Sequence, residues 1–346
     1  MTQPQTDPDP PVLALGQAHV TPEKAARLLH DYHGLTVLDL QRREAEAATV
    51  YRVDAEEDRF AVKIAAVPDS RGVEAMRWQT AYAEHLRDRG VPAVRALPDA
   101  TGEPVTLLPG LLTMQLFEWC EAPSLLSLVE AAPERADEFR RLAAELAARI
   151  SLASADAPAA PLDFTHPWDA RSFARTARER CPGLRETGLL PAGVPERLAA
   201  LAAVAEEAIA RAGGLPRSAV HQDLHSGNIL LDGPGERAVC VLDFGDAVPG
   251  VRAAEFAVAA SYQLRSAEDP AVALREMTET YARIAPLDAA ERRALPALCT
   301  ARRAVGLVMF ADMTVRTASR ERARRELAEL PRLLERVERD AAACGV

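Results

Sequence analysis

The pattern of apolar residues changes about a third of the way along the chain, near residues 118–123, and this change restricts the folds that the sequence can adopt. Before it, short apolar runs such as residues 49–53 and 60–64 alternate with charged turns, which is typical of antiparallel strands. After it, stretches rich in Ala, Leu, Arg and Glu predict helices at about 124–131, 134–152 and 194–212, and almost throughout beyond residue 250. The sequence therefore predicts an α+β, bilobal protein, with a small antiparallel sheet lobe and a larger, mainly helical one.

A chain of 346 residues is long enough for two lobes that each bury a core. In the first lobe, Thr21 is a typical N-cap residue for a helix that ends near residue 32, and residues 73–89 predict a second helix. Residues 154–192 are rich in proline and glycine, so we interpret them as an insertion over the functional site. The expected limits are residues 1–11 for a disordered lead-in, 12–119 for a nucleotide-binding N-terminal lobe and 120–346 for the helical C-terminal lobe.

Composition and charge limit the partners and the compartment. Apolar residues make up 48% of the chain and charged residues 27%, and no run approaches the roughly 18 apolar residues that span a bilayer. The net charge of −10 disfavours a nucleic-acid partner. The start has no basic segment followed by an apolar one, and five scattered cysteines fit neither a disulfide framework nor a zinc site. We expect a cytoplasmic protein that binds neither nucleic acid nor a membrane.

A polar loop between short β-like runs carries the chemistry. Residues 218–231 read Ser-Ala-Val-His-Gln-Asp-Leu-His-Ser-Gly-Asn-Ile-Leu-Leu, and another apolar run leads to Asp243-Phe244-Gly245. Metal-assisted phosphoryl transfer needs a carboxylate near the attacking hydroxyl and oxygen ligands for Mg²⁺ that bridges nucleotide phosphates. We expect Asp223 to accept the proton of the substrate hydroxyl, and Asn228 and Asp243 to hold the metal.

Other residues of the same segments have supporting roles in this interpretation. His221 is expected at a strand end, where it supports the loop together with His225. Gly227 and Gly245 are expected to give the backbone the freedom to turn beside the metal. Hydrogen bonds within a buried turn would explain any one of these polar residues, but not the whole set together with Asp243.

These motifs resemble those of the aminoglycoside phosphotransferase and choline kinase-like enzymes, which are relatives of protein kinases. Their usual pattern is His-Gly-Asp-Leu-His-x-Gly-Asn, followed by a hydrophobic residue and Leu, and then Ile-Asp-Phe/Trp-Gly/Glu. This chain departs from it at Gln222, in place of Gly, and at Leu242, in place of Ile. The resemblance covers roughly residues 20–330 and implies a protein kinase-like fold, with ATP or GTP as phosphoryl donor and Mg²⁺ as cofactor.

The resemblance also assigns residues of the first lobe to the nucleotide. Lys63 lies in an apolar strand-like run, where a lysine can reach the α- and β-phosphates, although an edge-strand lysine that faces solvent is the plainer alternative. Glu74 and Glu84 lie on the following helix and are candidate partners for this lysine. Residues 74–86 resemble the hydroxylysine kinase-like branch, in which Gln79 takes the usual glutamate's place, and the partner stays open.

No glycine-rich loop precedes Lys63, since residues 40–49 occupy its position. We therefore expect backbone amides or the Thr49 hydroxyl to cover the phosphates. Residues 115–119 are expected to form the hinge that reads the purine, with Gln115, Phe117 and Trp119 at the nucleotide, and they do not decide between ATP and GTP.

The acceptor is expected to be a small molecule, because Asp246 leads straight into a helix where protein kinases have a peptide-docking segment. The resemblance implies that Glu255 braces the catalytic loop. We expect Asp246, Tyr262 and Arg302 to contact the acceptor. His166, Trp168 and Asp169 of the insertion are further candidates, although an exposed loop often carries such residues without a role. Arg302 would either bind an anionic group of the acceptor or pair with a nearby acid, which is the more frequent outcome for arginine.

Three classes of acceptor fit the sequence. An antibiotic of the aminoglycoside or nucleoside type comes first, because the composition, rich in Ala and Arg and poor in Lys, suggests a GC-rich bacterial genome, where antibiotic modification is common. Hydroxyamino acids, such as hydroxylysine or homoserine, and amino alcohols, such as choline, are the alternatives. A pseudokinase without turnover is a further alternative, which the complete set of Lys63, Asp223, Asn228 and Asp243 disfavours.

Overall fold

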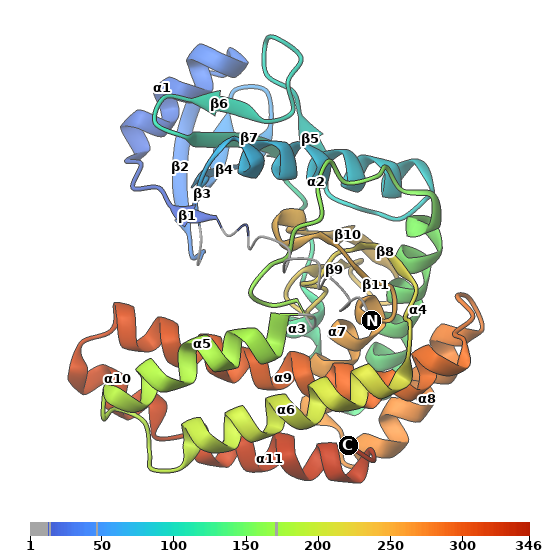
Figure 1. Cartoon of the computed structure of the whole chain (residues 1–346). Coiled ribbons are helices and arrows are strands. Elements are labelled where there is room, and N and C mark those ends of the chain that lie inside the picture. The colour runs from blue at the N-terminus through green and yellow to red at the C-terminus, as the bar shows by residue number, and fades with distance from the viewer. Residues whose placement is uncertain (1–12, 14, 46–47, 170–171) are drawn as a thin grey trace, which may run out of the picture. The chain divides into compact units, whose positions relative to one another are not determined.

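The computed structural model describes residues 13, 15–45, 48–169 and 172–346, which form two compact units (Figure 1). The sheet unit comprises the chain up to residue 81 together with residues 95–119 and 159–166. The helical unit comprises residues 82–94, 120–158 and 167–346. The lead-in expected at residues 1–11 lies outside the described residues.

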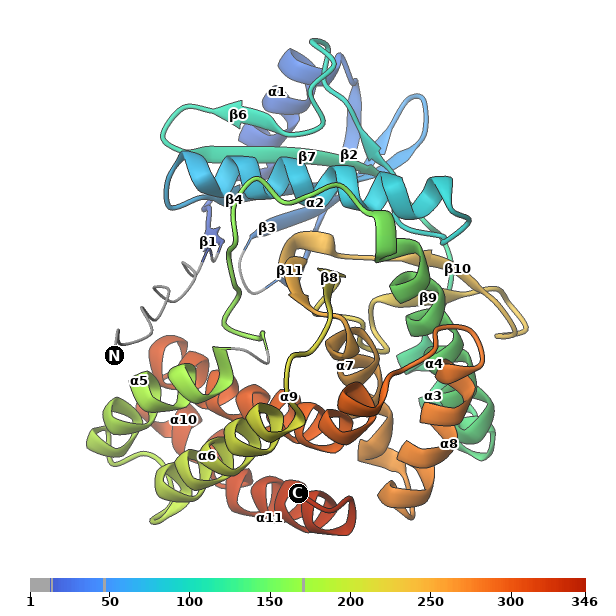
Figure 2. The same cartoon turned by 45° about the vertical axis from the view of Figure 1, so that its right-hand side comes forward.

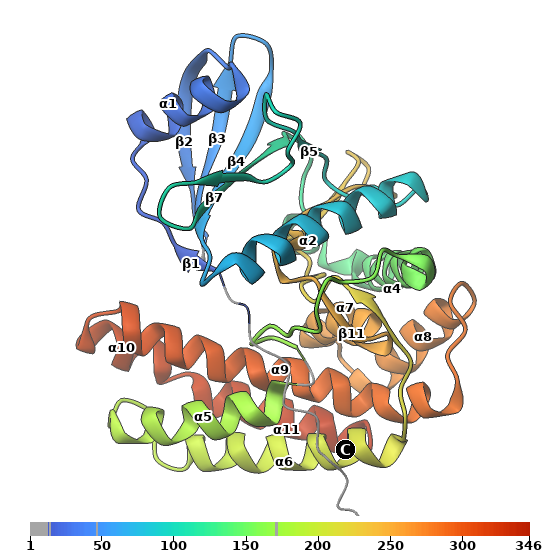
Figure 3. The same ribbon diagram turned by 45° about the horizontal axis from the view of Figure 1, so that its top comes forward.

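An antiparallel sheet forms the centre of the sheet unit (Figure 3). Its main path is β2-β3-β4-β7-β5, with β1 paired to β4 and β6 paired to β7. Alternate residues of β3 are buried from Thr49 to Ala55, because successive side chains of a strand point to opposite faces and one face packs on the core. The strands are β1 (Gly16–Gln17), β2 (Val37–Arg43), β3 (Thr49–Ala55), β4 (Arg59–Ala66), β5 (Ala96–Leu97), β6 (Thr106–Leu108) and β7 (Leu112–Glu118).

Helix α1 (Pro22–His33) confirms the first predicted helix. The Thr21 hydroxyl accepts a hydrogen bond from the Lys24 amide at 3.4 Å, which satisfies one of the free amides at the helix start. Gly34 ends the helix with a φ of 70°, a left-handed conformation that glycine adopts without steric cost. Buried Leu29 of α1 joins the core formed by the inner face of the sheet.

Helix α2 (Ser70–Asp88) confirms the second predicted helix, and its first half packs on the sheet (Figure 2). Met76 is buried in an apolar cluster with Val73 and Val105. Further along, the Thr80 hydroxyl accepts a hydrogen bond from the side-chain amide of Gln115 on β7 at 2.9 Å. This face of α2 therefore covers the side of the sheet to which Gln115 points.

The helical unit is built around helix α9, which contacts α5, α6, α7, α10 and α11 (Figure 1). Buried Leu198 of α6, Val305 of α9 and Leu334 of α11 belong to one apolar core. The helices are α3 (Leu125–Ala131), α4 (Ala136–Ala153), α5 (Phe173–Glu186), α6 (Val194–Ala212), α7 (Ala253–Gln263), α8 (Pro270–Ala282), α9 (Ala289–Thr317), α10 (Arg320–Leu327) and α11 (Leu330–Ala343). The predicted helices at 124–131, 134–152 and 194–212 are thus confirmed.

Two features of this unit differ from the expectations. Residues 154–192 do not simply interrupt the helices, because α5 occupies residues 173–186 and buries Phe173, Ala177 and Leu184 against the core despite Pro182 inside it. Helix α9 is also long and apolar enough to cross a membrane by length and composition, although no such run was expected. Its most apolar window is 72% buried inside the protein, which is typical of a core helix.

Candidate active site

Two pairs of short antiparallel strands in the helical unit position the polar loop. Strand β8 (Arg217–Val220) pairs with β11 (Val248–Val251), and β9 (Ile229–Leu231) pairs with β10 (Ala238–Val241). The loop between β8 and β9 carries residues 221–228, while β10 leads directly to Asp243. A backbone hydrogen bond from the Leu242 amide to the Asn228 carbonyl, 2.9 Å long, holds the two segments together. The two motifs of the sequence therefore lie side by side.

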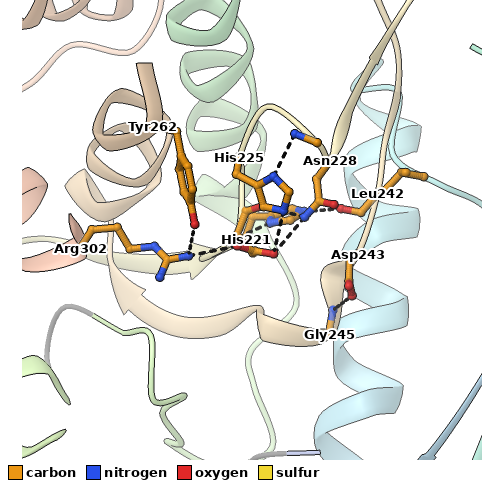
Figure 4. A network of polar contacts seen from close by, with 10 residues as sticks. His221, His225, Asn228, Leu242, Asp243, Gly245, Tyr262 and Arg302 are labelled. Atoms are coloured by element: carbon orange, nitrogen blue, oxygen red, sulfur yellow. Dashed lines mark hydrogen bonds and ion pairs between the residues drawn. The ribbon is translucent and has the colours of Figure 1, made fainter. Parts of the chain in front are cut away.

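Asn228 and Arg302, which are labelled in Figure 4, donate to the two carboxylate oxygens of Asp223. The side-chain amide of Asn228 donates to the Asp223 backbone carbonyl and to its Oδ2, both at 2.9 Å. Arg302 Nη2 donates to Oδ1 at 3.0 Å. Because Asn228 uses its amide nitrogen for these bonds, its Oδ1 is left as an oxygen donor for another group.

His221 connects the loop to the segment that carries Asp243. The ring is fully buried; its Nδ1 accepts a hydrogen bond from the Asp223 amide at 3.2 Å, so Nε2 carries the proton and donates to the Leu242 carbonyl at 2.9 Å. Burial lowers the pKa of His221, which keeps the imidazole neutral in this arrangement. The backbone amide of His221 also donates to Glu255 Oε2 on α7 at 2.8 Å.

His225 lies near the same carboxylate oxygen of Asp223 to which Asn228 donates. Its Nδ1 accepts a hydrogen bond from the Gly227 amide at 2.9 Å, and its Nε2 lies 3.6 Å from Asp223 Oδ2. Burial, and then the charge of Arg302, lower the pKa of His225 to about 4. The ring is therefore neutral near pH 7, and its centre lies 5.3 Å from that of Tyr262.

The backbone conformation around the loop corrects the expectation for its glycines. Neither Gly227 nor Gly245 has a positive φ; instead Gln222 (67°) and Asp243 (55°) adopt the left-handed region. Gly227 is needed for space, since a Cβ atom there would lie 2.6 Å from His225 Cε1. The left-handed backbone at Gln222 explains why the usual pattern has glycine there, since glycine adopts a positive φ without steric cost.

Three carboxylates gather at the site. Burial, followed by the charge of Asp246, raises the pKa of Asp223 well above its usual range, and Arg302 partly offsets this effect. Asp243 Oδ1 accepts a hydrogen bond from the Gly245 amide at 3.3 Å and also repels the Asp223 charge. This concentration of negative charge fits a divalent cation, which would relieve the repulsion.

The donors also suit magnesium. In the described part of the chain no three His, Cys, Asp or Glu side chains lie close enough to hold a metal by themselves. Mg²⁺ is usually held by one or two protein oxygens together with nucleotide phosphates and water, so Asn228 Oδ1 and the Asp243 carboxylate form a sufficient protein contribution.

The residues assigned to the nucleotide lie on the sheet unit. Lys63 is on β4, which runs between β3 and β7, so it is not an edge-strand lysine. Its register partner on β7 is Gln115, whose side chain points to the α2 side of the sheet, and register partners point to the same face. On α2, Gln79 is buried, whereas Glu74 and Glu84 are exposed. Of the three candidate partners for Lys63, Gln79 is therefore the one on the buried face of α2.

Other assigned residues of this unit have contacts that the sequence did not indicate. The Thr49 hydroxyl, expected at the phosphates, is buried and donates to the Ala18 carbonyl, because Thr49 opens β3 with its side chain on the core face. Phe117 is paired across the sheet with Ala61. Trp119 packs below the guanidinium groups of Arg43 and Arg52, which lie 5.5 and 5.4 Å from its ring centre.

An arginine–aromatic cluster lies beside Asp223 and brings together residues that the sequence analysis assigned to the acceptor pocket. The Arg302 guanidinium lies over the rings of Trp168, at 4.8 Å, and Tyr262, at 5.5 Å, and donates to the Tyr262 hydroxyl at 3.0 Å. The acid that pairs with Arg302 is thus Asp223 itself. Arg265 lies over the same Tyr262 ring at 4.7 Å, and no sequence motif marks it.

The fold and the site define a kinase-like phosphotransferase that transfers the phosphoryl group of a nucleotide to a hydroxyl group of a small molecule. Residues 39–293 match the model of the phosphotransferase enzyme family that includes the aminoglycoside phosphotransferases, so the chain belongs to this family. An uncharacterised protein of Deinococcus radiodurans is 31% identical over 299 residues, which cover 82% of this chain and 80% of that protein.

Solved structures share the fold at low sequence identity. A complex of an amicoumacin kinase with AMP-PNP, Ca²⁺ and its ligand has a TM-score of 0.69 and 15% identity, over 92% of this chain and 94% of that one. A microcompartment-associated aminopropanol kinase has a TM-score of 0.67 and 17% identity, over 93% and 98%. A spectinomycin phosphotransferase bound to ADP and spectinomycin has a TM-score of 0.61 and 11% identity, over 93% and 99%.

Proposed function

We propose that this protein transfers the γ-phosphoryl group of ATP or GTP to a hydroxyl of a small molecule, with Asp223 as the base and Mg²⁺ as the cofactor. The observation that carries the proposal is the double hold on the Asp223 carboxylate, by Asn228 from one side and by Arg302 from the other. Such a hold fixes the direction in which the carboxylate meets an incoming hydroxyl, and positioning is the main contribution of the protein in phosphoryl transfer.

The proposed step is a single displacement. The acceptor hydroxyl oxygen forms a bond to the γ-phosphorus, the bond between this phosphorus and the β-bridging oxygen breaks, and the nucleoside diphosphate leaves with the electron pair. Asp223 takes the hydroxyl proton. Mg²⁺, held by Asn228 Oδ1 and Asp243, would neutralise charge on the phosphate oxygens when it is bound.

The remaining residues support this centre. His221 joins the loop to the Leu242 carbonyl, and Glu255 on α7 accepts a hydrogen bond from the His221 amide. We therefore assign both residues to positioning the loop that carries Asp223. On the sheet unit, we assign Lys63 to the α- and β-phosphates and Gln79 to the place of the usual glutamate, with residues 115–119 at the purine. The Thr49 hydroxyl is not assigned to the phosphates, because it is already bonded to the Ala18 carbonyl.

The acceptor class is part of the proposal. Antibiotics are supported by the amicoumacin and spectinomycin enzymes among the structures with this fold, and amino alcohols by the aminopropanol kinase. The hydroxyamino acids gain support from the arginines around Tyr262, since Arg265 and Arg302 suit an acceptor with an anionic group better than a polycation. We place the protein in the cytoplasm, where nucleotides and a reducing environment agree with its five free cysteines.

The test is Mg²⁺-dependent phosphorylation of a mixed panel, followed by mass spectrometry. The panel contains aminoglycosides, nucleoside antibiotics, hydroxyamino acids and choline, each with ATP and with GTP, and Asp223→Asn is the control. A gain of one phosphoryl group on a panel member, absent with Asp223→Asn, supports the function. Nucleotide binding without phosphorylation of any member would instead indicate a pseudokinase.

A further inference from the structure

Three arginines of the helical unit, Arg265, Arg302 and Arg303, lie near one another, and they differ in whether an acid neutralises them. Arg302 is only 4% exposed and is paired with Asp223. Arg303 is buried and is paired with Asp340 at 2.7 Å. Arg265 has no ion pair with an acid in the described part of the chain. One guanidinium of the three is therefore without a compensating negative charge.

Arg265 is also the arginine that a ligand can reach. Its side chain extends to solvent, whereas Arg302 is enclosed between Trp168 and Tyr262. Protein atoms nevertheless surround part of its guanidinium, and this burial is the main cause that lowers the pKa of Arg265. The positive charges of Arg303 and Arg302 lower this pKa further. A cation in such surroundings gains more from an anionic partner than a fully solvated one, because water screens the attraction less.

A line of contacts connects this arginine to the proposed base. Arg265 lies over the Tyr262 ring at 4.7 Å. The Tyr262 hydroxyl accepts a hydrogen bond from Arg302 at 3.0 Å (Figure 4), and Arg302 donates to Asp223 at 3.0 Å. Tyr262 is held in place by these groups and by the His225 ring. Arg265 and Asp223 therefore lie at the two ends of the Tyr262–Arg302 contact. Arg265 provides a positive charge, and Asp223 provides the carboxylate that we propose as the base.

We propose that Arg265 binds a carboxylate of the acceptor, so that the substrate is a hydroxy acid or hydroxyamino acid and not a polycationic aminoglycoside. Arginine suits this purpose because its planar guanidinium can bind a carboxylate through two parallel hydrogen bonds. The inference rests on the proposed function and specifies its acceptor. The acceptor carboxylate takes no part in the bond changes, which involve only the hydroxyl, the γ-phosphorus and Asp223.

The test compares hydroxyamino acids with the amino alcohols that remain when their carboxylate is removed. The pairs are L-homoserine with 3-aminopropan-1-ol, L-threonine with 1-aminopropan-2-ol, and 5-hydroxylysine with 1,5-diaminopentan-2-ol, and kanamycin represents the polycations. For at least one acid and its matched amino alcohol, the full-length enzyme is expected to show a kcat/KM that is at least roughly 10-fold higher for the acid. A hydrogen bond between charged groups contributes a free energy of this size.

Variants of Arg265 separate recognition from catalysis. Arg265→Gln is expected to raise the KM of the preferred acid about 10- to 100-fold while kcat and the activity on the matched amino alcohol change little. Arg265→Lys should recover part of the loss, since it restores the charge but not the planar fork. Arg332→Gln is the control, because Arg332 is highly exposed on α11 and outside the site.

Each outcome decides between the alternatives. Equal or better turnover of the amino alcohols or kanamycin by the wild-type enzyme would overturn this inference and leave the phosphotransferase function standing. Equal losses on acid and amino alcohol in Arg265→Gln would also overturn it, because they indicate a structural role. Absence of phosphorylation across the panel, with nucleotide binding intact, would overturn the proposed function and this inference with it.

Discussion

Arg302 and Asp223, 79 residues apart in the chain, form a hydrogen-bonded ion pair at 3.0 Å. The arginine comes from the middle of α9, in the core of the helical unit, and the aspartate from the loop after β8. Because the arginine is almost fully buried, its charge is directed at one carboxylate and is poorly screened by solvent. The pair ties the proposed base to the core of the helical unit.

Replacing Arg302 by Gln is expected to shift the pH dependence of catalysis. Arg302 lowers the pKa of Asp223, against burial and the charge of Asp246, which raise it. Without the arginine this pKa rises, and since the base must be deprotonated, the acidic limb of the kcat profile should move to higher pH. We also expect kcat to fall about 10- to 100-fold at pH 7, as the carboxylate loses its orientation.

The matched control is Arg303→Gln, which breaks a neighbouring buried ion pair with Asp340 that does not contact the base. It should lower the free energy of unfolding by about 3 kcal/mol, as expected when one member of a buried pair is removed. An equal shift of the pH profile in both variants would show that the shift does not come from the contact between Arg302 and Asp223.

Asp223→Asn and Asp243→Asn are expected to fail in different ways. The first should reduce kcat at least about 100-fold and leave Mg²⁺-dependent ATP binding intact, because it removes only the proton acceptor. The second removes a ligand of the metal, so it should weaken ATP binding in the presence of Mg²⁺ as well. Calorimetry of ATP binding with and without Mg²⁺ measures the difference, and equal binding losses in both variants would contradict the assigned roles.

Gln222 holds a strained position, and its replacement should stabilise the protein. Its φ is 67°, and both polar atoms of its buried side chain are without a hydrogen-bond partner among the described residues. Gln222→Ala removes the unsatisfied amide and keeps the strain, whereas Gln222→Gly removes both. We expect the glycine variant to unfold with a free energy about 1 to 2 kcal/mol higher than the alanine variant, measured by urea denaturation.

The opposite order, with alanine the more stable of the two, would mean that the left-handed backbone is not strained at this position. Activity provides a second measurement for the same variants. Since Asp223 follows Gln222 directly, retained kcat in Gln222→Gly would indicate that the loop keeps its shape without the side chain.

Glu255 makes stability depend on pH. Burial raises its pKa from an ordinary 4.5 to about 8, although the His221 amide opposes the shift. The folded protein therefore holds a proton that the unfolded chain has released between these values. The resulting contribution to stability is complete below about pH 4.5 and is lost as the pH rises toward 8, with a slope of up to about 1.4 kcal/mol per pH unit.

Glu255→Gln should flatten the free energy of unfolding between pH 5 and pH 8, because glutamine cannot release this proton. Urea denaturation at three pH values in this window measures the slope. Glu145→Gln, which alters an exposed residue of α4, is the control and should leave the slope unchanged. A slope that persists in Glu255→Gln would assign the pH dependence to another group.

Much of the fold and the centre of the site could be predicted, because their signals are local. The period of apolar residues predicts strands before residue 119 and helices after it, and the N-cap at Thr21 depends on neighbours within a few residues. The spacing of Asp223, Asn228 and Asp243 is likewise a property of one short segment and its resemblance to a family. The conformation of this segment was less accessible, since the left-handed backbone lies at Gln222 and Asp243 and not at the expected glycines.

By itself, the sequence predicted the class of protein and the change from a sheet lobe to a helical lobe, and it led to the residues that we propose for phosphoryl transfer, because each of these signals depends on residues close together in the chain. Only the tertiary structure decided which acid Arg302 pairs with, that Lys63 lies on a central strand and that Arg265 shares Tyr262 with Arg302. These relationships join elements that are distant in sequence, and packing of apolar helix and sheet faces brings them together. No local pattern of residue types records which partners that packing selects.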